Sequence, residues 1–288
     1  MQISRLDALG RRSVGEGPVW DVAEQALYYI DILEKKVLRW HPESGAQAQW
    51  EVPDIVGSMA LREKGGAIVA LGDGVHTLDL DSGKTAPLAV LDPPDPTVQL
   101  ADGKVDRAGR FVFGTSHRKA REPRGGLYSL ANGAVTPLDI GLTLGNGPCW
   151  SPDSATLYHA DSMANIIYAY DYDIETGAAS NRRAFFDSSA YGPIPDGATV
   201  DADANIWTAI CEGGAVLCLS PAGKVLREIA MQTRLPASVM FFGPALDRMF
   251  VPSIDPSFLG REPDEADGWN YVIDGLGVTG LPEPRFAG

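Results

Sequence analysis

Three oxygen-bearing side chains stand in closely similar surroundings at widely separated points of the sequence. Glu16 lies in Gly-Glu-Gly-Pro, Asn146 in Gly-Asn-Gly-Pro and Asp196 in Pro-Asp-Gly. Carboxylate and amide oxygens are ligands for hard or borderline divalent cations such as Ca²⁺, Mg²⁺, Mn²⁺, Fe²⁺ or Zn²⁺. Taken singly, each residue is more simply explained as part of a turn, because Asn, Asp and Gly are common there. Whether the three residues form a site therefore depends on the elements that position them.

The elements around these residues belong to an internal repeat. Apolar and β-branched runs typical of strands recur with anchors 40, 43, 46, 49 and 43 residues apart, at Tyr28, Ile68, Phe111, Leu157, Ile206 and Met249. Each repeat opens with one of these strands, continues into a second strand and leaves room for about two more. A period of 40 to 50 residues with about four strands is the signature of a β-propeller. We predict an all-β fold, a six-bladed β-propeller that forms a single domain over residues 1–288. A β-sandwich, the main alternative, would not need so regular a spacing.

Equivalent positions in a propeller converge, because the innermost strand of every blade lines the central channel. Counting back 10 to 12 residues from each anchor gives Glu16, Ser58, Ala101, Asn146, Asp196 and Ser238. Two carboxylates and an amide are costly to bury unpaired, whereas a divalent cation would neutralise them. The repeat therefore predicts a metal site at the central channel.

Charge and composition narrow the class of partner. The formal net charge of −14 argues against a nucleic-acid partner, which needs clustered Lys and Arg. No apolar run approaches the roughly 20 residues that cross a bilayer, and the start of the chain lacks the apolar core of a signal peptide. We expect a cytoplasmic protein, a monomer or weak homo-oligomer, whose partner is a small molecule rather than a nucleic acid or a membrane. The three cysteines are expected to be reduced.

Several long segments occur in the order of a known family: GEGPVW at 15–20, DGKVDRAGRFVFGT at 102–115, NGPCWSPDSATLYHADS at 146–162, PDGATVDADANIW at 195–207 and LPEPRFAG at the C-terminus. On these motifs the chain resembles the senescence marker protein, gluconolactonase and luciferin-regenerating enzyme family, which includes regucalcin. The resemblance implies a six-bladed propeller with one divalent cation at its axis, and many members hydrolyse sugar lactones. It also implies that Glu16, Asn146 and Asp196 are the metal ligands. The Asn-Gly-Pro-Cys motif at 146–149 resembles the corresponding motif of sugar lactonases of the xylonolactonase kind.

The sequence departs from that family where the substrate is expected to bind. Before Asp-Gly-Lys-Val-Asp the family usually has Arg-x-Asn, and this chain has Gln99 and Ala101 in the two outer positions. Glu212 lies where many members carry a tryptophan before the paired glycines, and His117 begins the basic segment 117–124. We expect all four residues to face the substrate. The alternative for Gln99 and Glu212 is a solvated loop residue, and the alternative for the segment 117–124 is an exposed hairpin whose charges keep it solvated.

The ligand set and the resemblance together predict a metal-dependent hydrolase, a lactonase that converts a sugar (aldono-) lactone to the aldonic acid. The cation would polarise the carbonyl group, and Asp196 would act as the catalytic base by taking a proton from water. Two alternatives stay open. The same metal site would act on a non-sugar lactone or ester, or in another metal-assisted reaction, or the protein would bind a cation without catalysis.

Overall fold

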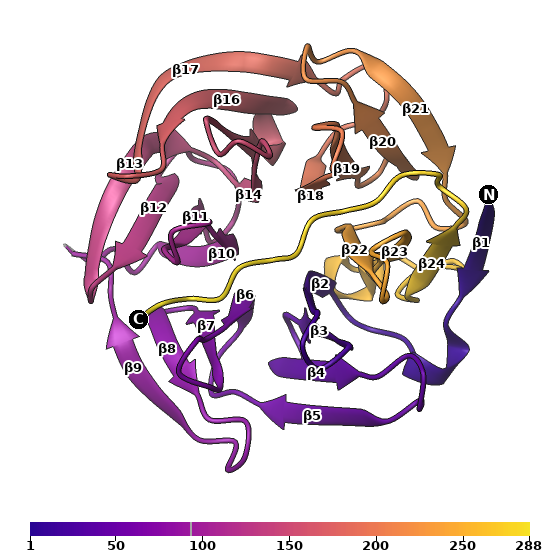
Figure 1. Ribbon diagram of the computed structural model, residues 1–288, viewed down its shortest axis with the longest axis horizontal. Helices are drawn as coiled ribbons and strands as arrows, with labels where there is room; N and C mark the ends of the chain where they lie inside the picture. The colour runs from indigo at the N-terminus through magenta and orange to yellow at the C-terminus, as the bar shows by residue number, and fades with distance from the viewer. Residues whose placement is uncertain (93) are drawn as a thin grey trace.

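The computed structural model of the protein describes residues 1–92 and 94–288 and confirms the six-bladed β-propeller. Six antiparallel sheets of four strands each surround a central axis, as Figure 1 shows. Blade 1 contains β2 (Gly15–Asp21), β3 (Ala26–Asp31), β4 (Lys36–Trp40) and β5 (Gln47–Glu51). Blade 2 contains β6 (Val56–Leu61), β7 (Ala67–Leu71), β8 (Gly74–Leu78) and β9 (Thr85–Ala89). Blade 3 contains β10 (Val98–Val105), β11 (Phe111–His117), β12 (Gly125–Ala131) and β13 (Ala134–Leu142).

The remaining blades complete the ring. Blade 4 contains β14 (Gly145–Trp150), β15 (Thr156–Asp161), β16 (Ile166–Asp173) and β17 (Ala178–Asp187). Blade 5 contains β18 (Pro195–Val200), β19 (Ile206–Ile210), β20 (Ala215–Leu219) and β21 (Val225–Ala230). Blade 6 contains β22 (Met240–Phe242), β23 (Arg248–Val251), β24 (Tyr271–Asp274) and, as its outermost strand, β1 (Gln2–Arg5). Because β1 pairs with β24, the first and last strands of the chain close the ring in one blade.

The phase of the repeat differs from the prediction in one respect. The strands that carry the six anchors, expected to open each repeat, are the second strands of the blades, β3, β7, β11, β15, β19 and β23. The innermost strands contain fewer apolar residues because they carry the polar residues of the channel. Among the residues that the structure describes, helical structure is limited to the 3-10 turns η1 (Asp7–Leu9), η2 (Ser162–Ala164) and η3 (Pro256–Leu259). In the described part of the chain, no helix has the length and apolar character that crossing a membrane requires.

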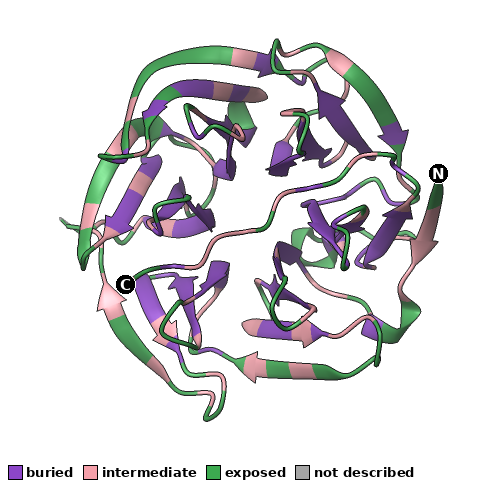
Figure 2. Ribbon diagram, in the orientation of Figure 1, coloured by how far each residue is buried: buried purple, intermediate pink, exposed green. Residues whose placement is uncertain are grey.

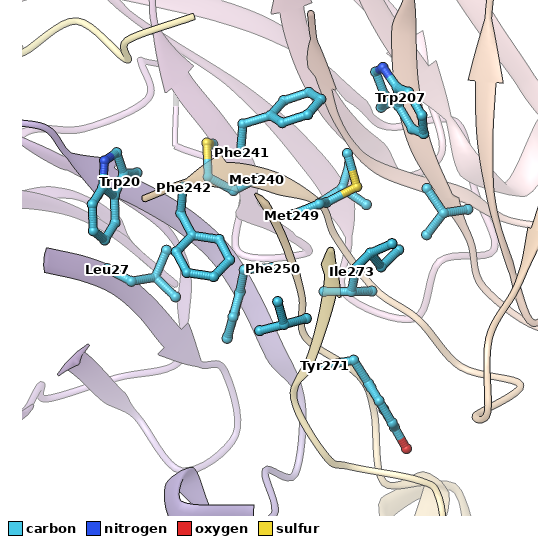
Figure 3. Packing of buried hydrophobic residues seen from close by; sticks show 14 of the residues in the cluster. Trp20, Leu27, Trp207, Met240, Phe241, Phe242, Met249, Phe250, Tyr271 and Ile273 are labelled. Atoms are coloured by element: carbon cyan, nitrogen blue, oxygen red, sulfur yellow. The ribbon is translucent and has the colours of Figure 1, made fainter. Parts of the chain in front are cut away.

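Burial follows the strand order within each blade. The inner strands are buried, whereas outermost strands such as β5 alternate between exposed and half-buried residues (Figure 2). Side chains from neighbouring blades fill the space between the sheets. Figure 3 shows part of the cluster that joins blades 5, 6 and 1. There the rings of Trp20 and Phe242 lie 5.7 Å apart, and those of Trp207 and Phe241 lie 6.0 Å apart, both edge to face. Such packing holds the blades at fixed angles around the axis.

The last residues form a strap across one face of the propeller. This C-terminal strap (residues 275–288) runs past the centre of the ring in Figure 1. Its backbone accepts a hydrogen bond from Ala202 and donates to Leu246, Leu61 and Gly109, all near the turns that follow innermost strands. The buried ring of Phe286 anchors its end. The strap therefore covers the end of the channel at which the innermost strands finish, and the other end holds the residues near their starts.

Candidate metal centre and catalytic site

One cavity collects the three residues that the repeat predicts as ligands. Glu16 on β2, Asn146 on β14 and Asp196 on β18 all line a hollow of about 170 Å³ at the end of the channel opposite the strap. Gln99 and Ala101 on β10 line the same cavity. The structure thus brings together five of the seven residues singled out by sequence.

Local irregularities in the innermost strands aim these side chains inward. The pairing of β2 with β3 shifts after Glu16, and that of β14 with β15 shifts after Asn146, as expected for β-bulges. The following glycines, Gly17 and Gly147, have φ of +51° and +58°, a conformation that other residues adopt at a cost. A Cβ atom on Gly147 would also come within 2.6 Å of the Asp196 backbone oxygen. The Glu-Gly and Asn-Gly dipeptides are therefore requirements of the bulges that build the site.

A third acidic residue lies in the cavity. Asp102 follows Ala101 on β10, is buried, and accepts backbone hydrogen bonds from Gly103 at 2.8 Å and Gly147 at 2.9 Å. One carboxylate oxygen therefore stays on its own strand while the other ties blade 3 to the bulge that presents Asn146. Both oxygens of Asp102 therefore have backbone donors, and the bond from Gly147 supports the position of Asn146.

A hydrogen-bond chain orients the Asn146 side chain. Its amide nitrogen donates to the Ser162 hydroxyl at 3.0 Å, and that hydroxyl donates to the Pro195 carbonyl at 2.6 Å. Because the amide nitrogen bonds Ser162 and Asn146 lines the cavity, the amide oxygen is the atom left to act as a cation ligand. The hydrogen-bond chain also connects blade 4 to the residue before Asp196, so two of the three candidate ligands share one support.

The charges in the cavity are not balanced by the protein itself. Burial raises the pKa of Glu16 well above its usual range, and repulsion from Asp196 and Asp102 raises it further. Burial and repulsion from Asp102 likewise raise the pKa of Asp196, and the adjacent Gly197 amide only partly offsets this. Burial also raises the pKa of Asp102, although Lys104 opposes that change.

These features fit a divalent cation. Two buried carboxylates without a full set of partners and one oriented amide oxygen supply three hard oxygen ligands, and a cation would remove the cost of burying their charge. Within residues 1–92 and 94–288, no cluster of three or more His, Cys, Asp or Glu side chains has metal-ligand geometry. The candidate centre differs from such clusters because one of its three ligands is an amide.

A family model described as "SMP-30/Gluconolactonase/LRE-like region" matches residues 14–255. The chain belongs to this family. Regucalcin of Xenopus laevis is 35% identical over 96% of this chain and 95% of its own length, and regucalcin of Gallus gallus is 33% identical over the whole of both chains. A luciferin-regenerating enzyme structure superposes with a TM-score of 0.92 at 27% identity and covers 99% of both chains. A calcium-binding regucalcin from Agrobacterium tumefaciens gives a TM-score of 0.90 at 28% identity, covering 98% of this chain and 96% of its own.

Within this SMP-30/gluconolactonase chain, the other two expected substrate residues lie outside the cavity. Ser116 lines the cavity, and the next residue on β11, His117, points to the opposite face because strand side chains alternate. His117 instead takes a long hydrogen bond from the Arg121 backbone amide. Glu212 pairs with Arg261 and lies 3.7 Å from Arg234. The expectation that His117 and Glu212 face the substrate therefore has no support in the geometry.

Proposed function

We propose that this family member is a cation-dependent lactonase that hydrolyses a cyclic ester to the hydroxy acid. The observation that carries the proposal is the pair of buried carboxylates, Glu16 and Asp196, that converge with an oriented amide oxygen in one small cavity. The family match supports it, because the family name includes gluconolactonase. A cavity beside the ligands favours catalysis over cation storage alone, because it leaves room for a substrate.

Glu16, Asn146 and Asp196 would hold the cation. When bound, the cation supplies polarisation of the ester carbonyl and stabilisation of the oxyanion that develops on it. Asp196 accepts a proton from the attacking water as the water oxygen bonds to the carbonyl carbon. The ring C–O bond then breaks, and Asp196 returns the proton to the released alkoxide, so the carboxylate is regenerated. General-base help of this kind is worth about 10²- to 10⁴-fold in rate.

The rest of the cavity sets the charge of the substrate. Gln99 and Ser116 offer hydrogen bonds without charge, and no Lys or Arg is among the described residues that line the cavity. A neutral lactone is therefore preferred over one that carries a carboxylate or a phosphate. A neutral sugar lactone of the aldonolactone class is the first group to test, since gluconolactonase is part of the family name.

The test is proton release from a panel of neutral aldonolactones and simple lactones by protein that is chelated and then supplied with Ca²⁺, Mg²⁺, Mn²⁺, Fe²⁺ or Zn²⁺. Turnover that needs one of these cations and falls at least 100-fold in Asp196→Asn supports the proposal. The matched control is Asp203→Asn, an exposed carboxylate in the β18–β19 turn of the same blade, which is expected to keep full activity. Saturable cation binding without turnover of any lactone would instead favour a cation-binding protein. Undiminished turnover in Asp196→Asn would refute the role given to that residue.

A further inference from the structure

The walls of the candidate cavity are aliphatic. Apart from the polar residues already described, the lining includes the side chains of Val14, Ile32, Ile55, Leu144 and Ile254. They come from segments next to the innermost or second strands of blades 1, 2, 4 and 6, so they surround the cation ligands on several sides. All but Val14 are half-buried, so part of each of these residues remains accessible to solvent.

The backbone fixes part of this wall. Val14 and Ile254 form an antiparallel bridge between the segments that precede β2 and follow β23. The Ile32 amide donates to the Val14 carbonyl at 3.0 Å, so three of the aliphatic residues belong to one hydrogen-bonded unit. Leu144 is adjacent to Gly145, which begins β14, and its backbone is bridged to Ser116. These side chains are therefore built into the rim of the channel and are not on free loops.

Polar partners for a substrate are few. Beyond the carboxylates and Asn146, Gln99 and Ser116 are the neutral polar side chains among the described lining residues. A lactone with a hydroxyl on nearly every ring carbon would place several hydroxyls against Ile32, Ile55 or Ile254. Each hydroxyl would lose its bond to water and gain no partner.

The segments next to this wall also expose apolar side chains. Leu33 follows Ile32 and is 38% exposed, whereas Phe258 and Leu259, in η3 shortly after Ile254, are 52% and 58% exposed. Single exposed apolar residues are ordinary. These three residues follow the wall residues Ile32 and Ile254 in the sequence, on two separate segments.

Resting on the proposed lactonase function, we propose that the preferred substrate is a lactone with an alkyl substituent, whose chain lies against Ile32, Ile55 and Ile254, rather than a polyhydroxylated lactone of the same ring size. The reacting ester group would sit at Glu16, Asn146 and Asp196, and the alkyl chain would extend toward the channel mouth. Burial of one methylene is worth about three- to fourfold in binding. The alkyl chain is therefore the part of the substrate that this cavity distinguishes best.

The turnover experiment compares δ-valerolactone, δ-decalactone and glucono-δ-lactone, which share a six-membered ring, with the cation-loaded protein. We expect kcat/KM for δ-decalactone to exceed that for δ-valerolactone by at least tenfold, with glucono-δ-lactone the poorest. Ile55→Thr is expected to lower the δ-decalactone to δ-valerolactone ratio about threefold or more, whereas Ile55→Val keeps it within about twofold. Leu226→Thr, at an exposed apolar residue on β21 of blade 5, is the remote control and keeps the ratio unchanged. A higher kcat/KM for glucono-δ-lactone, or equal values for the two simple lactones, would overturn the inference while leaving the lactonase proposal intact.

A binding measurement separates the inference from the proposed reaction. Isothermal titration calorimetry of the cation-loaded protein with an unsubstituted δ-lactam, a pentyl-substituted δ-lactam and a gluconolactam needs no turnover. We expect the pentyl-substituted lactam to bind at least tenfold more tightly than the other two. If no lactone is hydrolysed but this order holds, the cavity selects alkyl-substituted rings and the lactonase proposal alone fails. If the gluconolactam binds most tightly, or all three bind equally, the apolar selection is refuted whatever the reaction.

Discussion

The C-terminal strap is expected to stabilise the propeller through one ion pair in the channel. Lys104 on β10 is 7% exposed in its side chain, donates a hydrogen bond to the Ala198 carbonyl at 2.7 Å and lies 3.7 Å from a carboxylate oxygen of Glu283 on the strap. The Glu283 side chain is 16% exposed. The pair therefore joins blade 3, blade 5 and the strap at a place that water reaches poorly. Replacement of either partner should leave the other as a buried charge without its counterion.

The size of the effect follows from the separation. Two unit charges at this distance attract by about 4 kcal/mol at an effective dielectric constant of about 20, before the cost of removing them from water is subtracted. A net coupling of about 1–3 kcal/mol remains. We expect Glu283→Gln to lower the free energy of unfolding by about 1–3 kcal/mol and Lys104→Met by about 3 kcal/mol, because the latter also removes a counter-charge from Asp102. The double variant should lose about 1–3 kcal/mol less than the sum of the two single losses.

Urea unfolding of the chelated protein, followed by circular dichroism, measures all four members of this cycle. Arg285→Gln is the matched control, because Arg285 anchors the strap to Asp21 on blade 1 and does not touch Lys104. The loss of unfolding free energy caused by Arg285→Gln should add to the loss caused by Lys104→Met within about 0.5 kcal/mol. Additivity of Glu283→Gln with Lys104→Met to the same precision would refute the reasoning, since it would show that the strap carboxylate and the channel ammonium do not interact.

Three further predictions concern the candidate site and a buried histidine. Asp196→Asn should raise the melting temperature of the chelated protein, because it removes a buried charge. In the wild type, a cation at 100 times its Kd should raise the free energy of unfolding by about 2.7 kcal/mol, and Asp196→Asn should abolish this stabilisation. Scanning calorimetry measures both effects. Gly147→Ala should weaken cation binding at least tenfold by calorimetric titration, because its Cβ would force the bulge away from Asp196, whereas Gly133→Ala, at a glycine with similar φ and open space around it, should not. Burial lowers the pKa of His159 to about 4 from 6.5, and neither ring nitrogen has a partner among the described residues, so the unfolded chain takes up the proton first as pH falls. The free energy of unfolding therefore falls as the pH drops from about 6.5 to about 4, and it is about 2 kcal/mol lower at pH 5 than at pH 7. His159→Gln should remove this part of the pH dependence of urea unfolding. If the variant shows the same difference between pH 5 and pH 7 as the wild type, the role given to His159 is wrong.

The propeller and the three candidate ligands could be predicted because both depend on the position of residues within a regular repeat. An apolar strand every 40 to 49 residues fixes the number of blades, and the positions before Tyr28, Leu157 and Ile206 converge at the axis without any knowledge of distance. The closure of blade 6 by β1 and the path of the strap could not be read in this way. Neither segment repeats, so no period indicates its place.

Asp102 shows where counting fails and which signal remains. Counting back from Phe111 selects Ala101, but β10 contains a bulge between Leu100 and Gly103, and a bulge shifts the facing residue by one position. The composition of the dipeptides is a better guide than the count. A polar residue followed by glycine occurs at Glu16-Gly17, Asp102-Gly103, Asn146-Gly147 and Asp196-Gly197, and each of these pairs lies at an irregularity of an innermost strand. The same limit explains His117, since a one-residue shift on a strand exchanges the face that a side chain occupies.

Charge alternates along the channel, and this arrangement separates stability from cation affinity. The acidic cluster lies at one end, Lys104 follows, and Glu283 on the strap comes last. Lys104 lowers the pKa of Asp102 whereas Glu283 raises it, so the ammonium offsets part of the negative potential that a cation would meet. Lys104→Met should therefore bind the cation severalfold more tightly although it unfolds more easily, and Glu283→Gln should bind it more weakly. Calorimetric titration with Ca²⁺ and Mn²⁺ tests both directions. If Lys104→Met weakens cation binding, Lys104 supports the site through the position of β10, and its charge is not what sets the affinity.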